Sequence, residues 1–222
     1  SEALAGLRKA LTDPYLLRLA PAWLCINAIV GLWLGQPLTI LLSQQENRGQ
    51  FLTGLFFGQS VRIGLIFLAY TIVFATGVTI WSFFIARLER KRVLNIALVG
   101  MFFACAGFYL LNHSQDWSAG ARWALIAGIA VSIMVESGFT PAALALLADV
   151  VGAQGGRGAA MGIYSVLLSI GAGGGSYIAG VLGNRFAVDG LIYGTVAMAA
   201  IAFVTVHFLP EQPVQEGERV YG

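Results

Sequence analysis

Long, uninterrupted runs of apolar residues dominate this chain of 222 residues. Six runs have the length of about 20 mostly apolar residues that a helix needs to cross a bilayer. They cover residues 19–42, 63–86, 93–111, 123–148, 159–183 and 191–209. Because apolar residues follow one another without alternation, and an open sheet cannot pair its backbone groups in lipid, the runs predict helices rather than strands. The expected fold class is therefore all-α: a polytopic membrane protein with six transmembrane helices.

The same pattern divides the chain into three parts. Residues 1–18 form a polar-ended lead, residues 19–209 form one six-helix transmembrane domain, and residues 210–222 form a polar tail that we expect to be disordered. The first run is too long for a signal peptide, and about eighteen residues precede it.

Composition supports a membrane protein and excludes several other classes. Hydrophobic residues make up 58% and charged residues 11% of the chain, whereas a soluble domain carries about 25% charged residues. Cys25 and Cys105 lie inside apolar runs, where we expect buried thiols rather than a disulfide. A net charge of +2 with scattered charges does not suit a nucleic-acid partner.

The basic residues predict the orientation in the membrane. Six crossings place both termini on one side, and cytoplasmic loops carry the excess of Lys and Arg. One side holds Arg8, Lys9, Arg18, Arg87, Arg90, Lys91, Arg92, Arg157 and Arg219, and the other holds Arg48, Arg62, Arg122 and Arg185. We therefore expect both termini to be cytoplasmic, in a plasma or bacterial inner membrane.

One acid lies at mid-depth in the fourth run. Glu136 is the only Asp, Glu, Lys or Arg that we place deep in any of the six, and an acid at that depth should face a wet cavity or a partner. Ser132 and Thr140 share its helix face at a spacing of four residues, while Gly138 and Pro141 predict a hinge beside it. Glu136 is thus a candidate for binding a proton, a cation or a polar substrate group. The alternative is a neutral carboxyl that bonds a neighbouring helix for packing.

Two further features concern the first and fifth runs. Asn27, Trp33 and Gln36 precede a break at Pro37, and cavity lining and interhelical hydrogen bonding both remain open for these side chains. In the fifth run, Gly171, Gly175, Ala179 and Gly183 form a smooth stripe that predicts close helix packing. Its glycine cluster follows no strand and lacks a P-loop Lys, so we do not expect it to bind a nucleotide.

The loop between the second and third runs resembles the basic signature of the major facilitator superfamily. That signature reads Gly, three residues, Asp-Arg, any residue, Gly-Arg-Arg/Lys. Arg87, Arg90 and Lys91 match it, whereas Ser82, Ala86 and Glu89 replace the first Gly, the Asp and the second Gly. The lead into the family's seventh helix resembles segment 13–19, and the exit of its twelfth helix resembles segment 209–211. The connection between its tenth and eleventh helices resembles segments 145–149 and 157–163.

This resemblance implies helices seven to twelve of a twelve-helix transporter, with an inverted three-plus-three repeat that pairs the first span with the fourth. An amino-terminal six-helix half would be missing, and the second and fifth spans would contact it. The third and sixth spans would face lipid. The central cavity would be lined by Asn27, Gln36, Ser132, Glu136 and Thr140. Arg87 or Arg90 would pair with Asp149 as a cytoplasmic gate, unless these arginines only set the topology.

The expected function is secondary active transport of a small solute by alternating access, with proton-coupled export of an amphipathic compound as the specific hypothesis. The alternatives are an uncoupled facilitator, a six-helix channel and, most remotely, an intramembrane serine protease built on Ser176 and His207. We expect no enzyme activity, cofactor or bound metal. The expected partners are the lipid bilayer, a small-molecule substrate and protons.

Overall fold

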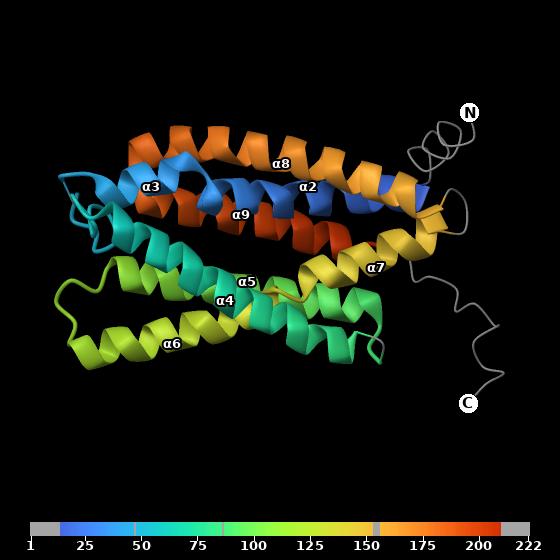
Figure 1. Cartoon of the computed structure of the whole chain (residues 1–222), viewed down its shortest axis with the longest axis horizontal. Coiled ribbons are helices and arrows are strands. Elements are labelled where there is room, and N and C mark those ends of the chain that lie inside the picture. Colours follow the sequence, from blue (N-terminus) through green and yellow to red (C-terminus); the bar gives the residue numbers. More distant parts are fainter. Residues whose placement is uncertain (1–13, 47, 86, 153–155, 210–222) are drawn as a thin grey trace.

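The computed structural model of the protein describes residues 14–46, 48–85, 87–152 and 156–209 (Figure 1). Within these ranges the regular structure is entirely helical. The helices are α2 (Pro14–Leu34), α3 (Gln36–Ser43), α4 (Ser60–Phe84), α5 (Arg90–Asn112), α6 (Ala119–Glu136), α7 (Phe139–Gly152), α8 (Gly156–Phe186) and α9 (Val188–His207).

Six segments are long and apolar enough to cross a membrane, which confirms the predicted number of spans. They are Leu17–Ser43, Val61–Phe84, Arg90–Asn112, Ala119–Ala148, Met161–Phe186 and Val188–His207. The first span combines α2 with α3, and the fourth combines α6 with α7.

The helices pack as two groups of three that share α5–α9 contacts. In one group α2 packs against α8 and α9, and in the other α6 packs against α4 and α5. Figure 1 shows α7 passing from the second group towards α8 of the first. An inverted repeat matches the first three spans to the last three, so α2–α8 corresponds to α6–α4 and α2–α9 to α6–α5. The contacts follow that correspondence.

Both broken spans are interrupted where the sequence places Gly and Pro. Gly35 is extended and separates α2 from α3, and Pro37 lies in the first turn of α3. In the fourth span Ser137 and Gly138 separate α6 from α7, and Pro141 lies in the first turn of α7. Proline suits the start of a helix, where its missing N–H has no partner to lose.

The glycine stripe of α8 packs against α2 and α3. A Cβ on Gly175 would run into the carbonyl oxygen of Ala28, and one on Gly171 would come within 2.5 Å of Asn27 Cβ. Ala179 is fully buried, and a Cβ on Gly183 would approach Leu41 at 3.1 Å. The resemblance implied a missing half as the partner of this stripe. Its contacts lie within the chain instead, because the first span occupies that side of α8.

The junction of the last two spans is shorter than the apolar runs suggest. Helix α8 continues to Phe186 and α9 begins at Val188, so a single residue, Ala187, connects them. Ala187 has a φ of 53°, a left-handed conformation that is uncommon for a residue with a Cβ. The predicted sixth run began three residues later. The structure therefore places Asp189 in the first turn of α9 and buries it, whereas the runs left it in a loop.

Candidate functional site

Glu136 is the last residue of α6 and stands directly at the break of the fourth span. Its side chain is half-buried, and no residue in the described part of the chain forms a hydrogen bond or ion pair with its carboxyl. The carboxyl lies close enough to Tyr70 of α4 and Cys105 of α5 to interact electrostatically with both. An acid at this depth with no fixed partner is available to bind a proton, a cation or a polar group.

The backbone beside Glu136 is held by a tryptophan from α4. The indole N–H of Trp81 donates to the carbonyl oxygens of Met134 and Val135, each at 3.1 Å. Ser137 Oγ donates to the Met134 carbonyl at 2.8 Å. These bonds satisfy carbonyls near the end of α6 that the helix itself leaves unpaired.

Close contact with α4 depends on two glycines. A Cβ on Gly138 would come within 2.6 Å of the Trp81 ring, and a Cβ on Gly77 would run into Ser137 Oγ. Gly77 and Trp81 lie four residues apart on one face of α4. Neither residue was among those predicted from the sequence to lie at this site. The signal that could have indicated this contact is a Gly and a Trp four residues apart in a span that packs against the predicted hinge.

The break separates Thr140 from Ser132 and Glu136, which both lie on α6. The Ser132 hydroxyl donates a hydrogen bond to the Gly128 carbonyl at 2.9 Å, and Ser132 lines a groove between α5, α6 and α9. Thr140 is half-buried in the first turn of α7. The helical spacing of four residues holds from Ser132 to Glu136 but does not carry from Glu136 to Thr140, because residues 137 and 138 interrupt the helix. Whether Ser132 or Thr140 meets substrate stays a prediction.

The polar residues of the first span do not converge on one site. Asn27 is buried against Gly171 of α8, and its Nδ2 has no hydrogen-bond partner among the described residues. Trp33 donates to Thr195 of α9 at 2.7 Å, and Gln36 is exposed at the start of α3. Their role in a cavity stays a prediction, since the three side chains have different surroundings.

The basic residues near the α4–α5 connection make backbone contacts. Arg90 Nη1 donates to the carbonyl of Ile85 at 3.0 Å, and Lys91 Nζ donates to the carbonyl of Leu209 at 2.7 Å. Arg87 is exposed. The side chain of Asp149 lies outside the described part of the structure, so its pairing with Arg87 or Arg90 stays a prediction.

Ser176 and His207 have separate environments. Ser176 Oγ donates to the carbonyl of Gly31 at 3.1 Å, which fastens α8 to α2. The His207 ring contacts Phe203 and Phe208 at the end of α9. In the described structure these two residues do not form the hydrogen bond that a Ser–His pair requires.

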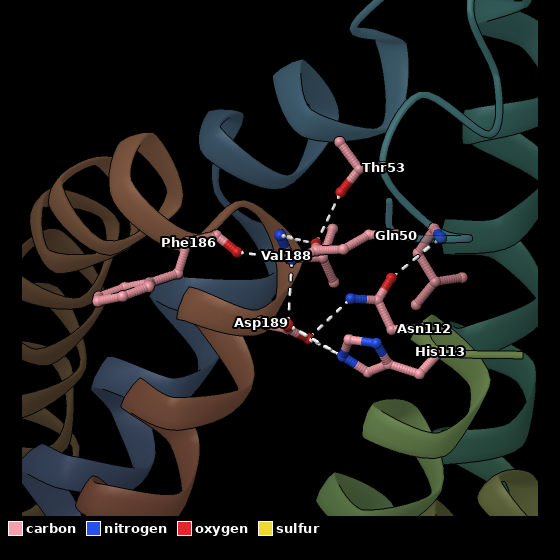
Figure 2. A network of polar contacts seen from close by, with 8 residues as sticks. Gln50, Thr53, Asn112, His113, Phe186, Val188 and Asp189 are labelled. Carbon is pink, nitrogen blue, oxygen red and sulfur yellow. Dashed lines mark hydrogen bonds and ion pairs between the residues drawn. The ribbon is translucent and has the colours of Figure 1, made fainter. Parts of the chain in front are cut away.

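A buried polar network at the α8–α9 junction was missed by the sequence analysis (Figure 2). Asp189 Oδ1 accepts from Asn112 Nδ2 at 2.8 Å, and Asp189 Oδ2 accepts from Gln50 Nε2 at 3.1 Å. His113 Nε2 lies 3.0 Å from Asp189 Oδ2. The network joins the 44–59 loop, the end of α5 and the start of α9.

Gln50 is the centre of this network. Its Nε2 donates to Phe186 as well as to Asp189, and its Oε1 accepts from the backbone N–H of Val188 and the hydroxyl of Thr53 (Figure 2). Both amide donors and both acceptor positions are thereby used. The Gln50 side chain thus holds the residues on both sides of Ala187 in place.

The sequence of this chain is similar to a known protein family. The family model described as Major Facilitator Superfamily matches residues 22–220. No curated protein and no solved structure matches the chain. Since the match covers nearly the whole chain, and since six apolar spans with the helix contacts above accompany it, this protein belongs to the major facilitator superfamily.

Proposed function

We propose that the protein contributes to secondary active transport of a small amphipathic solute by alternating access, with Glu136 as the proton-coupling group. Membership of the family supports membrane transport in general. The observation that carries the finer proposal is a carboxyl at mid-depth, on a helix break, with no hydrogen-bond partner among the described residues.

The coupling follows from the cost of a charge in a dry environment. A carboxylate needs water or a cation around it, whereas a protonated carboxyl tolerates closure of the surrounding helices. Binding of a proton to Glu136 therefore favours an occluded state, and release favours a state that opens to water. The break gives α7 a pivot next to this group. Because Trp81 contacts the break, α4 would either move with α7 or restrain its movement.

A second six-helix bundle would complete the translocation path. Helices α4 and α8 are the least buried of the six spans, and large apolar side chains such as Leu68 and Ile72 of α4 are exposed. Both helices offer surface for an amino-terminal half of the kind that the family implies. Gating would involve Arg87, Arg90, Lys91 and Asp149, at the end of the spans opposite the 44–59 loop.

Glu136→Gln is the variant that tests the coupling role. It keeps the size and hydrogen-bonding capacity of the side chain but cannot take up or release a proton. In proteoliposomes containing the protein with its amino-terminal half, we expect an imposed pH gradient to drive movement of ethidium, a fluorescent amphipathic cation. The variant should lose at least about tenfold of this rate, which corresponds to roughly 1.4 kcal/mol.

Asp116→Asn is the matched control, because Asp116 is an exposed carboxyl in the α5–α6 loop. It should transport at the wild-type rate. Gradient-driven transport that survives Glu136→Gln unchanged removes Glu136 from the coupling mechanism. Wild-type transport that ignores the gradient but follows the ethidium concentration would instead establish an uncoupled facilitator.

A further inference from the structure

A groove on the lateral surface of the bundle is not used by the transport proposal. It has a volume of about 640 Å³ and lies over α5, with α6 on one side and α9 on the other. Small-molecule sites occupy about 300–1,000 Å³, so the space is large enough for a ligand. Its walls include Phe103, Val99 and Val131, which are 67%, 44% and 61% exposed. In a membrane protein such a surface meets acyl chains.

The groove's polar side chains are Asn95, His207 and Ser132, and the Ser132 hydroxyl already donates to the Gly128 carbonyl of its own helix. Asn95 and His207 lie where α5 begins and α9 ends, and Lys91 links those two helix ends through Leu209. The Oδ1 atom of Asn95 is buried and accepts no hydrogen bond from any described residue. A buried acceptor without a donor is costly, so a hydroxyl from outside the chain would be stabilised there.

A positive charge stands beyond this polar end. Arg92 is exposed and makes no ion pair within the described residues. It lies three residues before Asn95, seven before Val99 and eleven before Phe103, which places all four on one face of α5. At 1.5 Å per residue, the apolar floor from Asn95 to Phe103 extends about 12 Å towards the middle of the membrane.

We propose that this groove binds one anionic glycerophospholipid with a hydroxylated headgroup. Its phosphate faces Arg92, a headgroup hydroxyl donates to Asn95 Oδ1, and one acyl chain lies along Val99 and Phe103. The order of charge, hydrogen-bond acceptor and apolar surface along α5 matches the order of phosphate, hydroxyl and hydrocarbon in such a lipid. A second copy of the chain fits less well. The small residue on this part of α5, Gly100, is already covered by Val135 of α6, so no open small-residue stripe remains for a helix.

Spin-labelled lipids test this proposal with the protein in phosphatidylcholine vesicles. Electron paramagnetic resonance measures the motionally restricted fraction of labelled phosphatidylglycerol, phosphatidylmethanol and phosphatidylcholine. We expect phosphatidylglycerol to associate more strongly than phosphatidylcholine. Arg92→Gln should reduce that preference about fivefold, because a basic residue at the surface contributes about 1 kcal/mol. Arg62→Gln, at an exposed residue near the start of α4, should leave it unchanged.

The hydroxyl contact is tested separately. Phosphatidylmethanol keeps the phosphate charge but lacks the headgroup hydroxyls, so it should bind a few-fold more weakly than phosphatidylglycerol. Asn95→Leu should abolish this difference while it keeps the preference for an anionic lipid. Val99→Trp, which fills the groove, should abolish both, whereas Ile40→Trp at an exposed position of α3 should have no effect.

Circular dichroism and size-exclusion chromatography establish that each variant folds. Equal association of all three lipids with the wild-type protein would overturn the proposal. So would a phosphatidylglycerol preference that survives both Arg92→Gln and Val99→Trp. A dimer that Val99→Trp converts to a monomer, without a lipid preference, would overturn it in favour of a second copy in the groove.

Discussion

At the scale of single residues, a buried amide has a structural role that its position in a loop conceals. Gln50 uses all of its hydrogen-bonding capacity to hold the α8–α9 junction, where Ala187 has a left-handed backbone. Removal of Gln50 would take the hydrogen-bond partner from the Val188 N–H and the Phe186 carbonyl, whereas Asp189 would keep its contacts with Asn112 and His113. The energetic cost therefore comes mainly from the Val188 N–H and the Phe186 carbonyl rather than from Gln50 itself.

Gln50→Met should lower the thermal unfolding temperature of the purified protein. The variant keeps the side-chain length but leaves buried polar groups without partners, each at a cost of about 1–3 kcal/mol. Circular dichroism against temperature measures the change. Gln45→Met, at an exposed position of the same loop, should melt at the wild-type temperature. Equal melting of both variants would show that the network contributes no stability.

The sequence alone was enough to place Glu136 beside a helix break, but it did not predict the burial of Asp189. Glu136 was visible because a single acid interrupts a long apolar run. The burial of Asp189 could not be predicted in this way. It depends on the single-residue connection between α8 and α9 and on the hydrogen bond from Gln50, which belongs to a loop distant in the sequence. Apolar runs mark the length of a span to within a few residues, and three residues decide whether this acid lies in a loop or inside a helix.

At the scale of helices, small residues determine which spans can approach each other. Gly175 is needed because the carbonyl of Ala28 occupies the place of a Cβ, whereas Gly174 faces open space. The sequence stripe identified the packing face of α8. It did not identify α2 and α3 as the partners, since a repeat of small residues describes one surface only.

Gly175→Ala and Gly174→Ala form a matched pair one residue apart in α8. Gly175→Ala should destabilise the protein by about 1–3 kcal/mol through overpacking against α2. Gly174→Ala should be neutral or stabilise by up to about 1 kcal/mol, because Ala favours a helix over Gly. Thermal unfolding in detergent, together with the monodisperse yield, distinguishes the two. Equal behaviour would contradict the close α2–α8 contact.

Trp81→Phe tests how α4 holds the break of the fourth span. The substitution keeps an aromatic ring against Gly138 but removes the N–H that serves Met134 and Val135. We expect a loss of about 1 kcal/mol in stability and faster hydrogen exchange near residues 137–139. Trp117→Phe, at an exposed loop position, should change neither. Unchanged exchange in Trp81→Phe would mean that the indole does not fix the break.

At the scale of the whole molecule, the number of spans and their interruptions follow from the apolar runs and the Gly and Pro positions. The contacts between spans distant in the sequence do not, because they depend on the inverted arrangement of two three-helix units. Orientation rests on the distribution of basic residues and stays a prediction. The family and the six-helix fold could be predicted, but the partners of each helix required the structure.

The predicted orientation is checked with single cysteines in a variant that lacks Cys25 and Cys105. Gln45→Cys and Asp116→Cys should react with a membrane-impermeant maleimide in intact cells, and Glu89→Cys should react only after the membrane is opened. All three positions are exposed, and the α3–α4 and α5–α6 connections lie at the end of the bundle opposite the α4–α5 connection (Figure 1). The reverse labelling pattern would show that the termini face outward.

The central claim is that water reaches position 136 during transport, and a charged thiol reagent measures this most directly. Glu136→Cys in the cysteine-free protein should react with a positively charged methanethiosulfonate. Val131→Cys, on the exposed lateral surface of the same helix, should stay unmodified because it faces lipid. A Glu136→Cys variant whose introduced thiol resists the reagent from both sides of the membrane, while ethidium still moves down its own concentration gradient, would contradict the account.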